Sequence, residues 1–310
     1  MIFDENGCIK YTEAIEIEQK NLTAKFSLFV RAYHNKNFEN GIFNDGLAEK
    51  VLGSNDYNEI SENLINGINF FNPDFNGTKA EALRWIVNNQ LSPSVLARSA
   101  FCEKSLNNAV KLGCRQYLNL AAGYDTPAYR IPEIKTFEVD MPQMIEDKLK
   151  RLKRADIDYK NTTFVKCNLT SKDFSDIILN SGFDKNKTAF CSILGLSYYF
   201  KKEDFFGLLK ELSEILHDYS TITFDYPTDE TDKASETNRQ LANGAGEEMK
   251  SRYSYREIES ALEKGGFLIY EHLNSSQMTD NFFENFNKQN PNDKMYAPNG
   301  VNYCLAVKNI

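Results

Sequence analysis

The sequence predicts an α/β protein with a mostly parallel sheet, preceded by a helical N-terminal region. From Gln116 onward, short apolar segments with strand character alternate with segments of helical length. Strands that alternate with helices form parallel sheets covered on both faces, and ligands bind at the carboxyl ends of their strands. We expect strands at Gln116–Leu120, Thr136–Val139, Thr162–Lys166, Thr188–Leu194 and Thr221–Asp225, with helices at about Gln143–Arg154, Ser171–Leu179 and Glu203–Leu216.

The two ends of the chain complete this prediction. Helical signals dominate the first part, where an amphipathic segment, a capping box and a helix-ending glycine are found. We therefore expect a helical region or lid at residues 1–115 and the sheet domain at residues 116–310. The helices expected in the first part are Thr23–His34, Thr78 through Asn88, and Ser94–Leu112. Late in the chain, Ser254 and Glu257 cap another helix. Two strands follow it, at Phe267–His272 and Asn302–Lys308, and we expect the last strand to be antiparallel at or near an edge of the sheet.

Composition and charge narrow the classes of function. The chain has 310 residues, 41% of them hydrophobic, and a net charge of −8, which argues against nucleic acid as the main partner. No apolar run approaches the ~20 residues that cross a bilayer, and the N-terminus is acidic, so we expect a cytoplasmic protein with no membrane partner. Six cysteines without a Cys-x-x-Cys pair indicate reduced thiols, and three dispersed histidines give no reason to expect a metal.

The most informative stretch is the turn after the first strand of the sheet. Ala121-Ala122-Gly123 removes side-chain bulk where backbone must approach a ligand, and Asp140 ends the next strand seventeen positions after Gly123. Such a turn with a later carboxylate can bind an adenosine moiety through the ribose hydroxyls. The three-glycine spacing typical of nicotinamide dinucleotide sites is absent, and the turn alone also fits a strand end in another α/β protein.

Further short motifs follow in a fixed order from about Thr23 to the C-terminus. They are Thr23-Ala24 through Arg31-Ala32, Asp45 and Ala48, Ala97-Arg98, Leu120–Thr126, Glu138–Pro142 with Lys148, Gly195 and Tyr199, and Gly246-Glu247. Together they resemble the leucine carboxyl methyltransferase family, a branch of the S-adenosylmethionine-dependent methyltransferases that includes enzymes assigned to polyketide O-methylation. The resemblance implies a class I methyltransferase with a Rossmann-like, seven-stranded core and an N-terminal helical region that forms part of the acceptor pocket.

The resemblance also implies a set of residues that bind S-adenosylmethionine. Arg98 would hold the amino-acid carboxylate bidentately, or is a surface arginine of its helix. Asp140 would bind the ribose, or caps the helix that begins at Pro142. Met141 would lie against the adenine, or fills the core. The remaining candidates are Ala121, Ala122 and Gly123 in the turn, Asn168 and Leu169 after the third strand, and Leu194 after the fourth.

Several positions depart from the family pattern. Ala121 replaces the first turn glycine, Asn119 an acidic residue and Asn168 an aspartate, while Leu194 replaces a glutamate expected near the amino group of the ligand. These departures leave open an alternative function, a binding or regulatory protein that has kept the fold and lost methyl transfer.

The acceptor is the least determined part of the prediction. Tyr198, Tyr199 and Tyr226 are candidates for contacts with it, or they pack in the core. A sulfonium donor is already activated, so no dedicated nucleophile is expected. No histidine lies between Leu118 and Leu216, which favours a carboxylate that is already ionised at pH 7 over a hydroxyl that needs a base. The acceptor would be a small molecule or a peptide.

Two other sequence signals do not change this prediction. Gly195-Leu196-Ser197 lacks the second glycine of a nucleophile elbow. The basic run Lys148–Arg154 is expected to be a solvated helix face.

Overall fold

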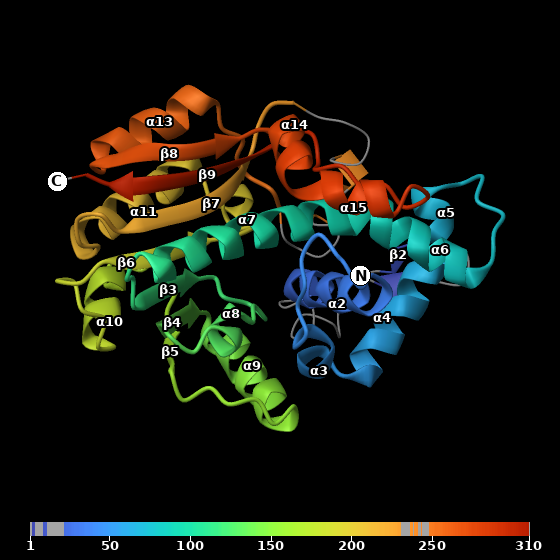
Figure 1. Ribbon diagram of the computed structural model, residues 1–310, viewed down its shortest axis with the longest axis horizontal. Helices are drawn as coiled ribbons and strands as arrows, with labels where there is room; N and C mark the ends of the chain where they lie inside the picture. The colour runs from blue at the N-terminus through green and yellow to red at the C-terminus, as the bar shows by residue number, and fades with distance from the viewer. Residues whose placement is uncertain are drawn as a thin grey trace. The chain divides into compact units, whose positions relative to one another are not determined.

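The computed structural model describes residues 2–3, 9–10, 22–230, 236–237, 239–240, 243 and 248–309 (Figure 1). The chain divides into two compact units. The first comprises Met1–Ala97, Thr231–Met249 and Met278–Asn299, and the second Arg98–Glu230, Lys250–Gln277 and Gly300–Ile310. This division falls within helix α7 (Ser92–Lys111) and places Met278–Asn299 in the first unit, whereas the predicted boundary lies at residue 115.

The second unit is built on a seven-stranded sheet in the order β5-β4-β3-β6-β7-β9-β8. β3 pairs in parallel with both β4 and β6, and β9 pairs antiparallel with β7 and β8. The last strand is therefore antiparallel and next to the edge, as predicted. The strands are β3 (Gln116–Leu120), β4 (Lys135–Asp140), β5 (Thr162–Lys166), β6 (Ala189–Ile193), β7 (Thr221–Pro227), β8 (Phe267–Leu273) and β9 (Val301–Lys308).

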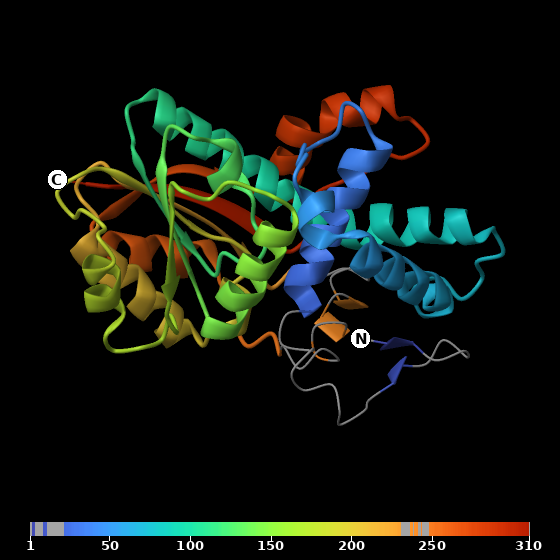
Figure 2. The same cartoon turned by 90° about the horizontal axis from the view of Figure 1, so that it is seen from below.

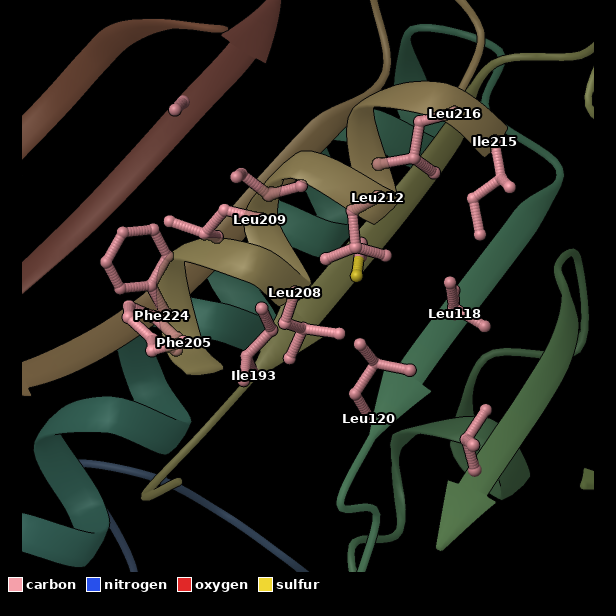
Figure 3. Close-up of a cluster of buried hydrophobic side chains, with 14 of the residues drawn as sticks. Leu118, Leu120, Ile193, Phe205, Leu208, Leu209, Leu212, Ile215, Leu216 and Phe224 are labelled. Atoms are coloured by element: carbon pink, nitrogen blue, oxygen red, sulfur yellow. The ribbon is translucent and has the colours of Figure 1, made fainter. Parts of the chain in front are cut away.

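One face of the sheet packs on helices α10 (Phe174–Asn180), α11 (Lys202–Ile215) and α13 (Tyr255–Lys264). Alternate strand residues such as Leu118 and Leu120 point to this side. Figure 3 shows them beneath the leucines of α11, among them Leu208 and Leu212. This apolar cluster is the core on that side of the sheet.

The opposite face carries buried polar residues and is covered by α7 (Ser92–Lys111), α8 (Pro127–Arg130) and α9 (Pro142–Arg154), so that helices lie on both sides of the sheet (Figure 2). Glu138 of β4 accepts from the Tyr129 hydroxyl at 2.8 Å and forms an ion pair with Lys148 Nζ at 2.7 Å. Both members of the pair are wholly buried. The prediction that Lys148–Arg154 forms a solvated face was therefore wrong for Lys148, since a buried carboxylate on the sheet requires a partner of opposite charge.

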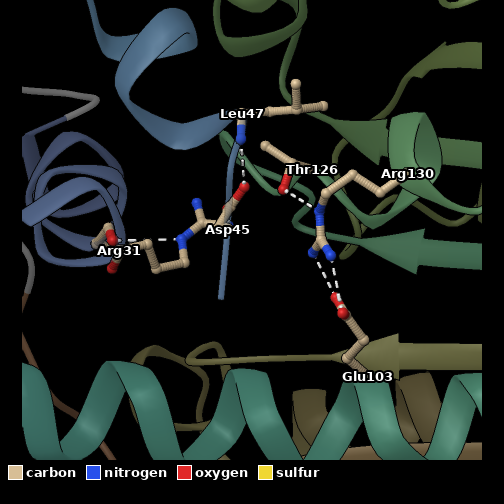
Figure 4. Close-up of polar contacts among 7 residues, drawn as sticks. Arg31, Asp45, Leu47, Glu103, Thr126 and Arg130 are labelled. Atoms are coloured by element: carbon tan, nitrogen blue, oxygen red, sulfur yellow. Dashed lines mark hydrogen bonds and ion pairs between the residues drawn. The ribbon is translucent and has the colours of Figure 1, made fainter. Parts of the chain in front are cut away.

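Side-chain hydrogen bonds connect the helices on the polar face of the sheet. The Arg130 guanidinium forms two hydrogen bonds to the Glu103 carboxylate, and its Nε donates to Thr126 Oγ1 at 3.1 Å (Figure 4). Arg130 thereby joins α8 to α7. These links fix the segment that follows the turn after β3.

The described part of the first unit is mainly helical. Buried Arg31 and Asp45 form an ion pair at 3.0 Å, and Asp45 also accepts from the Leu47 N–H (Figure 4). The Thr78–Glu81 capping box is present as predicted. The helices are α2 (Leu22–Asn37), α3 (Ala48–Leu52), α4 (Ser54–Asn66), α5 (Ile68–Phe71), α6 (Lys79–Ile86) and α15 (Glu284–Gln289), with π-helical turns η2 (Val87–Leu91) and η4 (Thr279–Phe283), and the short strands β1 (Ile2–Phe3) and β2 (Ile9–Lys10) pair with each other. None of the helices in the described part of the chain combines the length and the apolar character that a membrane span requires.

Candidate functional site

The turn after β3 has an uncommon backbone conformation. Ala121 has φ 51° and Gly123 φ 43°, both in the left-handed region that residues with a Cβ rarely adopt. Ala122 is buried between them, and its N–H donates to the Val139 carbonyl at 3.3 Å. The turn thus folds back on the end of β4, at the point where the strand order switches and where sheets of this kind bind ligands.

Asp140 ends β4, and its carboxylate connects two chain segments. Oδ2 accepts from the Gly123 N–H at 2.8 Å and Oδ1 from the Met141 N–H at 2.7 Å. Burial raises the pKa of this carboxyl, and the two backbone donors act in the opposite direction. Neither donor belongs to the first turn of α9, so helix capping does not describe the role of Asp140. A carboxylate has about four lone-pair sites, so both oxygens can accept further hydroxyl groups.

The residues after β4 and β5 present an apolar and a polar group at the same edge of the sheet. Met141 is 46% exposed, so the alternative that it fills the core is wrong. Asn168 is exposed, and its Oδ1 accepts from the Thr170 N–H at 3.1 Å and from the Thr170 hydroxyl at 3.0 Å. This turn holds the Asn168 amide in place, whereas Leu169 packs partly on the core.

Arg98 lies on α7 and is not a surface residue, since its side chain is 16% exposed. Its guanidinium lies against the backbone of Gly195, where an added Cβ would come within 2.8 Å of Nη1 and 3.0 Å of Cζ. Gly195 has φ 63°, which favours glycine for a second reason. Burial acts to lower the pKa of Arg98, but the carboxylate of Asp225 and other neighbours raise it overall, so the group is a permanent cation.

Asp225 is the residue of this cluster that the sequence analysis did not single out. It is wholly buried near the end of β7; Oδ1 accepts from the Gly195 N–H at 2.7 Å, and Oδ2 lies 4.0 Å from Arg98 Nη1. A carboxylate late in an apolar strand is the signal that identified Asp140, and it was available here as well. Leu194, at the position where the family pattern has a glutamate, is half-buried beside this cluster.

Two of the three predicted acceptor contacts have their hydroxyls engaged within the protein. Tyr198 donates to Asp225 Oδ2 at 3.0 Å, and Tyr226 is wholly buried with its hydroxyl 2.7 Å from His272 Nε2. Core packing, the alternative reading, describes both side chains. Tyr199 is half-buried and stays a candidate contact.

The incomplete nucleophile elbow and metal ligation can be examined at the same edge. Ser197, the serine of the incomplete elbow, is wholly buried and donates to the Asp225 carbonyl at 2.7 Å, so it is no exposed nucleophile. Among the described residues, no three His, Cys, Asp or Glu side chains are grouped so that they could hold a metal ion. Gly246 and Glu247 lie outside the described residues.

Comparisons with known proteins decide the family. A family model described as leucine carboxyl methyltransferase matches residues 24–213. The chain belongs to the leucine carboxyl methyltransferase family. Over 305 residues, or 94% of the chain and 98% of the relative, it is 36% identical to the putative S-adenosyl-L-methionine-dependent methyltransferase YktD of Bacillus subtilis. A protein of Mycolicibacterium paratuberculosis with the same putative function is 27% identical over 56% of the chain and 55% of the relative.

Solved structures support the fold. A DUF574 family protein from Streptomyces avermitilis has a TM-score of 0.58 at 13% identity, covering 94% of this chain and 100% of its own. A putative methyltransferase from Thermobifida fusca has a TM-score of 0.53 at 14% identity, covering 93% and 94%. With the seven-stranded sheet, these likenesses confirm the predicted class I methyltransferase fold.

The match to the leucine carboxyl methyltransferase family ends at residue 213, before Asp225. The carboxylate beside Arg98 is therefore supplied from outside the matched segment. In this chain, buried Asp225 lies beside the Arg98 guanidinium, although uncharged Leu194 stands where the family pattern has a glutamate.

Proposed function

We propose that this chain, a methyltransferase that uses S-adenosylmethionine, transfers the methyl group to an oxygen atom of a small molecule or peptide, and that this oxygen belongs to a carboxylate. The use of this donor is supported by two features at one edge of the sheet: the turn closed by Asp140, and the half-buried Arg98, whose guanidinium lies against Gly195.

The residues at this edge fit the ribose, the adenine and the carboxylate of S-adenosylmethionine. The lone pairs left on Asp140 suit the ribose hydroxyls, and the exposed side chain of Met141 suits one face of the adenine. The amide of Asn168 can donate to an adenine nitrogen and accept from its amino group. The guanidinium of Arg98 suits the amino-acid carboxylate, because its planar donors match two oxygens. Leu194 adds apolar surface next to this end of the site.

When bound, the donor supplies an electrophilic methyl group on a sulfonium centre. The chain then has to hold the acceptor oxygen in line with the methyl–sulfur bond and to exclude water. Asp225 contributes by fixing the Gly195 N–H and by lying beside Arg98, so that the cation and the turn keep their positions. Tyr198 completes this arrangement through its bond to Asp225.

The surroundings of the histidines support a carboxylate acceptor. His34 accepts the Ile42 N–H at Nε2, and burial lowers its pKa to about 4. His272 is bonded to Tyr226 and burial also lowers its pKa, while His217 lies beyond the C-terminal end of α11 with Nδ1 2.9 Å from the Asp218 carbonyl. A hydroxyl acceptor would need a base with a pKa near neutrality, whereas a carboxylate needs none.

A regulatory protein that binds the donor without transferring methyl is the alternative, favoured by the uncharged Leu194 at the amino end of the site. The two functions differ in turnover. A binding-only protein would take up S-adenosylhomocysteine in calorimetry but release no labelled product with any acceptor.

The test of the acceptor uses methyl-labelled donor. Candidate carboxylic acids, peptides and phenols are incubated with the chain, and the products are treated with mild base. Release of label as methanol supports an ester. A base-stable product would mean an ether and would overturn the carboxylate assignment while leaving methyl transfer intact.

A further inference from the structure

The first compact unit contains a cavity of about 510 Å³ that shares no residue with the proposed donor site. Its walls come from the loop before α6, from α6 with the π-helical turn η2, and from the segment after α15. The volume lies in the range of about 300–1,000 Å³ that is typical of small-molecule sites. Single π-helical turns such as η2 are frequent at functional sites.

One wall of the cavity is a fixed polar group of three side chains. Arg84 Nε and Nη2 each donate to the Asp293 carboxylate at 2.5 Å, and Asn88 Nδ2 donates to Asp293 Oδ1 at 3.1 Å. Asn88 is 5% exposed, and its Oδ1 has no hydrogen-bond partner among the residues that the structure describes. Because the amide nitrogen has to face the carboxylate, this oxygen is held as an acceptor. A buried acceptor without a donor is unfavourable, which points to a ligand hydroxyl or N–H.

The charges of the lining favour a neutral ligand over a simple ion. Arg84 and Lys294 are balanced by Glu81 and Asp293, so the lining has no net charge. The fork of Arg84 that would hold a carboxylate or phosphate is already occupied by Asp293. A neutral ligand therefore fits this cavity better than an anion or a cation.

The rest of the lining combines aromatic rings with amides. Trp85 and Phe75 provide apolar faces, and Asn76, Asn89 and Asn292 are exposed amides that can both donate and accept. A sugar ring has the matching chemistry, because its C–H face packs on an aromatic ring and each hydroxyl both donates and accepts. Sites of this kind join an apolar surface with a few placed polar groups.

We propose that this cavity binds a neutral polyhydroxylated ring of monosaccharide size, such as the sugar unit of a glycoside. The C–H face of the ring lies on Trp85, and a hydroxyl donates to Asn88. The proposal is independent of the methyl acceptor and of the proposed donor site.

Trp85 is the single tryptophan of the chain, so its fluorescence reports on this cavity. The full chain is titrated with methyl glucoside, methyl galactoside and methyl mannoside, and separately with sodium acetate and inorganic phosphate. We expect a saturable change with at least one glycoside and none with the two anions. No response to any glycoside up to about 50 mM, or a response to the anions alone, would overturn the proposal.

Variants locate the binding. Asn88→Leu and Asn292→Ala are expected to weaken glycoside binding by about two- to tenfold each, as for the loss of one neutral hydrogen bond. Asn58→Ala, at an exposed position of α4 in the same unit and outside the lining, is the matched control and should bind as the parent does. If Asn88→Leu does not fold, the glycoside affinity of Asn292→Ala tests the site by itself. Equal affinities for Asn292→Ala and Asn58→Ala would place the sugar elsewhere and refute the site.

Discussion

Gly195→Ala is expected to weaken the binding of S-adenosylhomocysteine while the sheet domain stays folded. The new Cβ would lie 2.8 Å from Arg98 Nη1 and 3.0 Å from Cζ, so the guanidinium has to move. Since it is the end of a flexible side chain, this movement costs little stability but displaces the group that we propose binds the carboxylate. Losing a charged hydrogen bond costs about 1.5–3 kcal/mol, which corresponds to about a 10- to 150-fold higher Kd.

The same substitution also strains the backbone, because Gly195 has φ 63°. A residue with a Cβ in the left-handed region costs about 1–2 kcal/mol. Gly266 has φ 72°, and nothing lies within 4 Å of an added Cβ. Gly266→Ala is therefore a control that introduces the backbone strain but no contact with a neighbouring side chain. Gly207 lies within α11, also with open space around it, and Gly207→Ala should be neutral or stabilise the helix by up to about 1 kcal/mol.

Urea unfolding and calorimetry with S-adenosylhomocysteine separate these effects. Gly195→Ala and Gly266→Ala should lose similar stability, and of the three variants Gly195→Ala alone should lose affinity. If Gly195→Ala binds S-adenosylhomocysteine as tightly as Gly266→Ala does, the placement of Arg98 against Gly195 has no part in binding, and the proposed role of Arg98 is refuted.

Three further predictions follow from buried polar groups. Asp140→Ala should raise the Kd for S-adenosylhomocysteine about 10- to 150-fold in calorimetry without changing the circular dichroism spectrum, and an unchanged Kd would remove Asp140 from the site. Lys148→Met leaves Glu138 buried without its cation and should cost about 3–5 kcal/mol in urea unfolding; a loss below about 1 kcal/mol would show that the pair is not needed. His34 has a folded pKa of about 4 against 6.5 unfolded, so its contribution of about 3 kcal/mol is complete above pH 6.5 and is lost as pH falls toward 4. Unfolding free energies measured from pH 7 to pH 4 should fall less steeply in His34→Gln, and equal slopes would contradict this.

The fold could be predicted because its signals are local. Leu118 and Leu120 with their apolar neighbours mark the strand before the turn, and the Thr78 and Ser254 capping boxes mark helix starts at the observed residues. The turn after β3 and Asp140 were found because small residues and a carboxylate at strand ends are hard to explain by packing. Such features depend on residues close together in sequence.

Pairings across the fold could not be predicted in this way. The basic run from Lys148 looks solvated by composition, and only the register of β4 beneath α9 shows that Lys148 meets Glu138. Asp225 is adjacent to Gly195 because β6 and β7 are neighbours, a contact between residues thirty positions apart. Tyr226 follows the predicted strand Thr221–Asp225, as a ligand contact would, but it lies within β7 and its hydroxyl is bonded to His272 on β8.

The position of β9 has a consequence for the order in which the protein can fold during synthesis. β9 lies between β7 and β8 but is translated after both. Until it emerges, β7 and β8 each present an unpaired edge, which is the part of a sheet most prone to pairing with other chains. Tyr303 of β9 is also the register partner of Asp225. A nascent chain that stalls before β9 therefore already holds the residues of the proposed donor site but still has two exposed strand edges, and Asp225 lacks its neighbour across the sheet.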